Sequence, residues 1–145
     1  MKPNSKRTLP PRFFHSLCLA ALFCLQVPAL QAAEPESRIF VISNKSERFI
    51  EIEKESLTLS KACLRANGKL DCQAYRESKL ASFKDLDASL FKGGAPGGPI
   101  LCAKLGGKRR IGNSPEGNER GFCTFPDGSS IATDSLEAIA AKNSP

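Results

Sequence analysis

The N-terminal segment is the most constraining feature of the chain, because it decides which residues the folded part keeps. Residues 1–12 carry four basic residues and no acidic one, and an apolar run from Leu17 to Leu25 follows. The segment closes on the small-residue stretch 29–33. This order is typical of a secretory signal peptide, and the apolar run is well short of the roughly 20 residues that span a bilayer. We expect a signal peptide at residues 1–32, cleaved after Ala32 or Ala33, and no transmembrane segment after cleavage.

Cleavage would change the composition on which functional inference depends. Lysine plus arginine falls from 21 to 17 against 15 acidic residues, so the formal charge falls from +6 to about +2. This weakens the argument for nucleic-acid binding that the basic composition suggests. The one histidine, His15, lies within the predicted signal, which leaves the remaining chain without the commonest general base and a common metal ligand. We therefore predict no catalytic residue, no metal and no cofactor.

The remaining cysteines predict disulfide bonds. Four follow the signal, at Cys63, Cys72, Cys102 and Cys123. An even number of cysteines in an exported chain indicates two disulfides, and neither Cys102 nor Cys123 belongs to a redox Cys-x-x-Cys pair. Cys63 and Cys72 bracket the turn-forming Asn67-Gly68, so a disulfide between them would join two antiparallel segments and contribute about 2–3 kcal/mol. Three pairings are possible for four cysteines.

The hydrophobic pattern predicts short strands and short helices. Strands at Arg38–Ile42 and Arg48–Glu53 are expected to form a hairpin around the polar turn 43–46. Residues 56–66 permit either a helix or the end of a strand. Further elements are expected as a helix at Cys72–Phe83 capped by Asp71, a helix at Pro99–Leu105, strands at Lys108–Ile111 and Gly121–Phe125, and a helix at Asp134–Lys142 behind an acidic cap. The expected fold class is α+β, a small disulfide-stapled exported protein of short antiparallel hairpins with short helices.

A glycine-rich segment divides the chain. Lys92–Gly98 has the composition of a linker, and it lacks the Gly-Lys-Ser/Thr sequence of a phosphate-binding loop. The predicted organisation is an N-terminal hairpin and disulfide-stapled segment at 33–91, a Gly/Pro linker at 92–98 and a small cysteine domain at 99–145. The 113 residues from position 33 onward are enough for one domain or two very small ones.

The second of these segments carries a family resemblance. The residues that carry it are Pro99, Cys102, Gly106-Gly107-Lys108, Gly121-Phe122-Cys123 and Phe125-Pro126-Asp127-Gly128-Ser129. In this pattern the segment from Gly98 to about Ser130 resembles the bacterial domain of unknown function 333. The resemblance implies an exported domain. Members of the family are often labelled haemolysins, a label that supplies no mechanism.

The chain also departs from the family pattern. Similar domains often have a further cysteine just after the Asp-Gly-Ser turn and a tryptophan nearby. Here Ile131 takes the place of that cysteine, and the sequence has no tryptophan. A pairing that used a later cysteine is therefore impossible in this chain. By comparison with the family, the simplest disulfide pairing is Cys102–Cys123 together with Cys63–Cys72.

Two groups of residues are candidate functional sites. Asp127-Gly128-Ser129 is better explained as a turn in which the aspartate binds local amides than as part of a hydrolase site. The basic cluster Lys104, Lys108, Arg109 and Arg110 is a candidate surface for an anionic partner such as lipid headgroups, acidic glycan or a protein. A solvated strand edge, whose charges prevent aggregation, explains the cluster more simply.

These observations favour one function class over two others. We expect an exported, non-catalytic binding or structural module, periplasmic or secreted, which acts on an unknown envelope or extracellular partner and not on nucleic acid. One alternative is a membrane-active protein, as the family label suggests. The other is a glycan hydrolase that uses carboxylates alone, which would need two carboxylates facing each other across a cleft.

Overall fold

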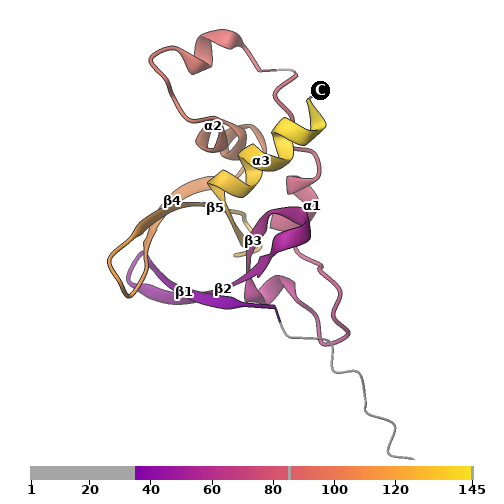
Figure 1. Ribbon diagram of the computed structural model, residues 1–145, viewed down its shortest axis with the longest axis vertical. Coiled ribbons are helices and arrows are strands. Elements are labelled where there is room, and N and C mark those ends of the chain that lie inside the picture. Colours follow the sequence, from indigo (N-terminus) through magenta and orange to yellow (C-terminus); the bar gives the residue numbers. More distant parts are fainter. Residues whose placement is uncertain (1–34, 85, 145) are drawn as a thin grey trace, which may run out of the picture. The chain divides into compact units, whose positions relative to one another are not determined.

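Six antiparallel strands close into a barrel in the computed structural model, which describes residues 35–84 and 86–144 (Figure 1). The predicted signal peptide lies outside the described residues. The strands follow one another around the barrel in the order β1-β2-β3-β6-β5-β4. Their bounds are β1 Ser37–Ile42, β2 Lys45–Ile52, β3 Leu57–Ser60, β4 Lys108–Asn113, β5 Glu119–Thr124 and β6 Ser130–Ala132. Strands from both sides of the glycine-rich segment thus build one barrel, and the described residues belong to one compact unit.

The first hairpin confirms the strand prediction for this part of the chain. β1 pairs with β2 from Ser37↔Ile50 to Ile42↔Lys45. Ser43 and Asn44 form the turn with positive φ angles of 49° and 65°, as two-residue hairpin turns require. The ambiguous segment that follows is strand β3, and a short 3-10 helix at Lys61–Cys63 comes after it.

Aromatic side chains fill the inside of the barrel. The rings of Phe40, Phe49 and Phe122 come from β1, β2 and β5, with centroids 4.3 to 5.7 Å apart. Ile42 and Ala132 complete this buried cluster. The lumen is tightly packed at Gly112, because a Cβ there would lie 2.7 Å from the Phe122 ring.

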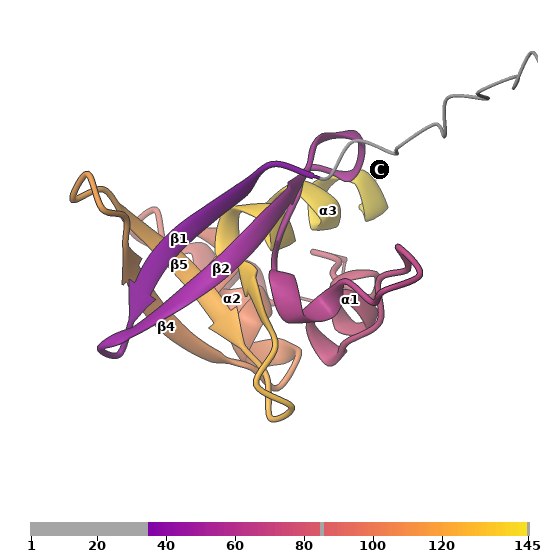
Figure 2. The ribbon, with the colours of Figure 1, turned by 90° about the horizontal axis from the view of Figure 1, so that it is seen from below.

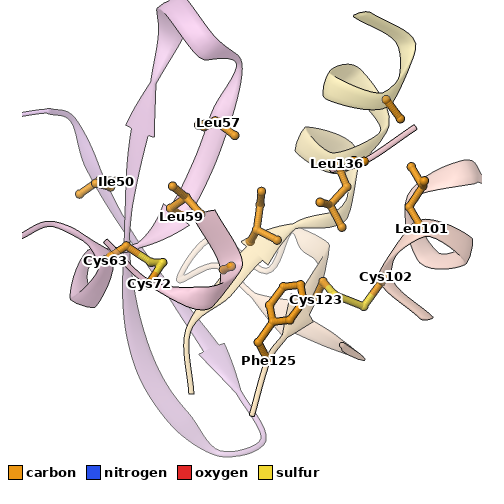
Figure 3. Close-up of a cluster of buried hydrophobic side chains, with 14 residues drawn as sticks. Ile50, Leu57, Leu59, Cys63, Cys72, Leu101, Cys102, Cys123, Phe125 and Leu136 are labelled. Atoms are coloured by element: carbon orange, nitrogen blue, oxygen red, sulfur yellow. A yellow bond between two sulfur atoms is a disulfide. The ribbon is translucent and has the colours of Figure 1, made fainter. Parts of the chain in front are cut away.

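A second and larger core lies between the outside of the barrel and three helices (Figure 3). The helices are α1 Gln73–Ser78, α2 Gly97–Lys104 and α3 Thr133–Asn143. Leu101 of α2 and Leu136 of α3 pack with Leu59 and Ile131 of the barrel. Every residue of β3 and β6 is therefore buried, including the polar residues Thr58, Ser60 and Ser130.

Two glycines of the predicted linker allow α2 to pack closely. A Cβ on Gly98 would lie 2.2 Å from the backbone oxygen of Thr133, and a Cβ on Gly97 would lie 2.7 Å from the Phe83 ring. Both glycines are buried at the start of α2, whereas Gly93 and Gly94 are exposed and have positive φ. Part of the glycine content of this segment therefore serves packing.

The predicted fold class is wrong, because the hairpins do not stand as separate units beside helices. The three-residue strand β6 joins them: Ile131 pairs with Leu59 of β3, and residues 130–132 pair with β5. Contact between β1 and β4 closes the barrel on the other side. A strand of three residues has no visible period in the sequence, and both closing contacts join segments about 70 residues apart.

Two helix predictions also need correction. The helix expected at Cys72–Phe83 covers only Gln73–Ser78, and its N-cap is Cys72, whose Sγ accepts from the Tyr75 N–H, in place of Asp71. Asp71 instead forms ion pairs with Arg65 and Arg76. The last helix begins at Thr133 without a side-chain cap, and Asp134 pairs with Arg120.

Candidate functional site

The turn that carries the most specific part of the sequence motif binds the start of α1. Asp127 Oδ2 accepts a hydrogen bond from the Gln73 N–H at 2.7 Å, and Ser129 Oγ accepts one from the Ala74 N–H at 2.9 Å. Asp127 Oδ1 accepts from the N–H and the hydroxyl of Ser129. The prediction that Asp127 binds amides of its own turn is therefore confirmed. The turn also satisfies two of the helix donors that would otherwise lack a partner.

This arrangement changes the acidity of Asp127. Burial raises the pKa of its carboxyl, but the hydrogen bonds from Ser129 and Gln73, together with nearby Arg76, outweigh burial and hold the pKa below its usual value. The carboxylate is thus ionised at neutral pH, and both of its oxygens accept hydrogen bonds. The geometry gives Asp127 and Ser129 a structural role in holding α1 against the barrel.

Both predicted disulfides form. Cys63 is bonded to Cys72 and Cys102 to Cys123, with Cα–Cα distances of 5.0 and 5.5 Å. The first bridge holds α1 to the segment after β3, and the second ties α2 to β5 (Figure 3). All four cysteines are buried.

The remaining motif residues also shape the packing. A Cβ on Gly107 would lie 2.2 Å from Cys123 Sγ, and a Cβ on Gly121 would lie 2.5 Å from Thr133 Oγ1. Gly106 follows α2 with φ +77°, Gly128 turns the chain with φ +82°, and Pro126 is exposed beside it. The motif therefore describes the junction of α2, β5 and the Asp127–Ser129 turn.

The seam between β1 and β4 is short, and it leaves two strand edges open. Only Val41↔Asn113 and Ile42↔Gly112 pair across this seam, whereas β1 and β2 pair over six positions. Among the described residues, no strand therefore pairs on this side with residues 37–40 of β1 or 108–111 of β4. Unpaired N–H and C=O groups on such an edge are able to pair with another chain.

The predicted basic cluster lies largely on one of these open edges. Lys108, Arg109 and Arg110 are exposed, and no side-chain hydrogen bond or ion pair joins them to any other residue in 35–84 or 86–144. Lys108 and Arg110 line a cavity of about 270 Å³ with Gly106, Thr124, Phe125 and Pro126. Arg109 points to the opposite face, since side chains alternate along a strand. Lys104 is separate from this row, at the end of α2, and it has an interaction of its own.

The other open edge borders a second cavity, a groove. This groove has a volume of about 650 Å³ and lies between residues 37–40 of β1 and residues 114–120 of the β4–β5 hairpin. Its charged lining residues are Arg38, Glu116, Glu119 and Arg120. A hydrogen bond from the Ser114 hydroxyl is the main cause that holds the pKa of Glu116 below its usual value, and the charge of Arg38 adds to it. Sequence reasoning missed this groove, because its two walls are distant in the sequence.

An arginine cluster lies beside the groove. Arg120 forms ion pairs with Asp134 at 2.9 Å and with Glu51 at 3.5 Å, and it donates a hydrogen bond to Thr58 Oγ1 at 3.1 Å. Arg38 reaches the same Glu51 oxygen at 3.4 Å. Glu51 and Asp134 line a cavity of about 300 Å³, but each is paired with Arg120. No sequence spacing links these residues, so folding alone brings them together.

Neither a membrane span nor a metal site is found where the chain is described. No helix within 35–84 and 86–144 is long and apolar enough to cross a bilayer. Within the same residues, no group of three or more His, Cys, Asp or Glu side chains is placed to hold a metal ion.

Comparison with known proteins bears on the motif segment alone. No curated protein and no solved structure matches the chain. One family model does, and its description is "Domain of unknown function (DUF333)". It matches residues 100–136, which run from α2 through β4, β5 and β6 into α3. The resemblance stated from the sequence is thereby confirmed: residues 100–136 are similar to the DUF333 family.

Proposed function

We propose that this protein is exported to the periplasm or secreted, and that it serves there as a non-catalytic module that binds an anionic partner through the β4 edge. The observation that carries the proposal is the row Lys108, Arg109 and Arg110. These three cations stand on an edge with no neighbouring strand and no compensating side chain in the described chain. The leader composition and the two disulfides support export, since disulfides persist in oxidising compartments.

The β4 edge is also held rigidly, which favours binding. All six residues of β4 pair with β5, and Arg109 lies opposite Cys123 of the second disulfide. Gly107 packs against both sulfurs of that bridge. A surface that is ordered before binding loses less conformational entropy when a partner arrives.

The binding role is tested by neutralising the row. The K108Q/R109Q/R110Q variant is compared with K54Q/K84Q/K92Q, which removes three exposed lysines elsewhere. The probes are phosphatidylglycerol vesicles, heparin and polyglutamate, each at low ionic strength where surface charge attraction is strongest. We expect the first variant to lose about tenfold or more in affinity for at least one probe, as three exposed charge contacts would give, and the control to lose little.

Other outcomes would contradict the proposal. If the charges only prevent aggregation, K108Q/R109Q/R110Q will self-associate and its affinity for every probe will stay unchanged. Hydrolysis of generic ester, peptide or glycan substrates by the purified protein would refute the non-catalytic part. Leakage of vesicle contents would favour membrane action. Export is tested separately by non-reducing mass spectrometry, in which retention of residues 1–32 would refute it.

A further inference from the structure

We propose a second binding site, independent of the β4 edge: the groove beside β1 accepts an extended polypeptide segment that carries basic side chains and pairs with β1 as an added strand. The site is the 650 Å³ groove lined by Ser37–Phe40 and by residues 114–120. Figure 2 shows β1 and the β4–β5 hairpin, the two elements whose residues line this groove. Its volume falls within the range of about 300–1,000 Å³ typical of ligand pockets.

The hydrogen-bond pattern identifies the backbone groups that face the groove. Glu51 N–H donates to the Glu36 carbonyl at 2.9 Å, so residues 36 and 51 form a hydrogen-bonded pair at the start of the β1–β2 ladder. Such pairs alternate along antiparallel strands. Arg38 and Phe40 therefore bind β2, whereas Ser37, Ile39 and Val41 direct their N–H and C=O groups to the opposite side.

β4 satisfies only the last of these three residues. The register between β1 and β4 includes Val41 and Ile42 but neither Ser37 nor Ile39. Two N–H and two C=O groups thus face the groove without a partner strand. An added strand pairs with such groups through its own backbone, which is the usual mode of peptide recognition at a sheet edge.

Two glutamates of the groove that form no ion pair within the described chain favour a basic segment. Arg38 is paired with Glu36 and Glu51, and Arg120 is paired with Glu51 and Asp134. By contrast, no Lys or Arg of the described chain lies within ion-pair distance of Glu116 or Glu119. Both glutamates are exposed on the wall opposite β1. Opposite charges on neighbouring strands each contribute about 0.2–1 kcal/mol.

An apolar contact is available on the outer face of the same edge. Ile39 and Val41 are 43% and 40% exposed, and both point away from the lumen because they alternate with the buried Phe40 and Ile42. Alternate side chains of an added strand would cover Ile39, while those between them would face Arg38 and Phe40. The site therefore fits an extended peptide better than a compact ligand.

The test is hydrogen exchange and chemical-shift mapping by NMR on the oxidised protein. The probe is an acetylated, amidated hexapeptide of alternating threonine and lysine, and its threonine–glutamate counterpart serves as the control. We expect the amides of Ser37 and Ile39 to exchange rapidly in the free protein and those of Arg38 and Phe40 to be protected. The lysine peptide should slow exchange at Ser37 and Ile39 at least severalfold, and the glutamate peptide should not.

Variants separate the backbone contribution from the charge contribution. E116Q/E119Q should weaken binding of the lysine peptide several-fold, while E53Q/E55Q, which neutralises two exposed glutamates outside the groove, should not. Ile39→Pro removes one groove-facing N–H and should abolish the protection of Ser37 by peptide, with folding checked by the shifts of β5. Three outcomes would overturn the proposal. The Ile39 amide could be protected in the free protein, the two peptides could bind equally well, or self-association of the protein alone could slow the exchange. Binding at the β4 edge is unaffected by each of these outcomes.

Discussion

The hydrogen bonds of Asp127 provide the sharpest test of how the motif stabilises the fold. In Asp127→Asn one carboxylate oxygen becomes an amide group that donates, so Gln73 N–H or the Ser129 donors lose their acceptor. Loss of a helix cap costs about 0.5–2 kcal/mol, and hydrogen bonds to a charged group are worth about 1.5–3 kcal/mol before their exposure is considered. Because Asp127 is exposed to solvent, we expect the free energy of unfolding to fall by about 1–2 kcal/mol at pH 7. Each kcal/mol corresponds to a decrease of roughly 4–8 °C in the Tm of a small domain.

The pH dependence of this effect follows from the direction of the pKa shift. Folding lowers the pKa of Asp127 below its unfolded value of about 3.9, so the unfolded chain binds the proton more readily. The stabilisation is therefore complete above the unfolded pKa and is lost as the pH falls through the folded pKa. The difference between wild type and D127N should be constant from pH 7 to about pH 5 and should decline below about pH 4.

Urea unfolding with intact disulfides measures both quantities. Asp87→Asn is the matched control, because Asp87 accepts a hydrogen bond from the Ser89 N–H two residues ahead, as Asp127 does, but binds no distant segment. We expect D87N to have the smaller effect. An unchanged midpoint for D127N at pH 7, or a difference that persists undiminished at pH 2, would refute the role given to the Asp127–Ser129 turn.

Two further predictions concern the cores. Phe122→Ala should lower the free energy of unfolding in urea by about 3–5 kcal/mol, because Phe122 is fully buried against two other rings in the lumen. Leu90→Ala, at an exposed position, should change it little, and a loss below about 1 kcal/mol for F122A would argue against a packed lumen. Replacing either cysteine pair by alanine should cost roughly 3 kcal/mol, slightly more for Cys102/Cys123, whose loop of 21 residues exceeds the 9 of Cys63/Cys72; equal stability of the Cys102/Cys123 variant and wild type would contradict this.

Local features of the fold were predictable because they depend on neighbouring residues. The β-rich composition of residues 38–42 and the alternation of residues 48–53 predicted a hairpin, and the glycines after α2 marked the end of that helix. The pairing of the cysteines could be predicted by comparison with the family pattern, because Ile131 takes the place of the further cysteine that similar domains have. The sequence also separated Lys108, Arg109 and Arg110 as a basic group, although it added Lys104, which lies on a helix away from that strand edge.

The barrel and the groove could not be predicted, since both depend on contacts between distant segments. Closure rests on the single pair Leu59↔Ile131 and on the two pairs between β1 and β4. Neither contact leaves a periodic trace, and a three-residue strand resembles a turn in sequence. For the same reason, nothing near Asp127 indicated that its carboxylate would accept the amide of Gln73, 54 residues earlier.

The sequence by itself determined the local conformations, the cysteines able to pair and the candidate chemistry of the basic residues, because these follow from residue type and near spacing. Only the tertiary structure decided that both halves form one barrel, that glycines 97 and 98 serve close packing, and that β1 and β4 each retain an open edge. The physical reason is that a strand can pair along both of its sides, and which side stays unpaired depends on where every other strand lies.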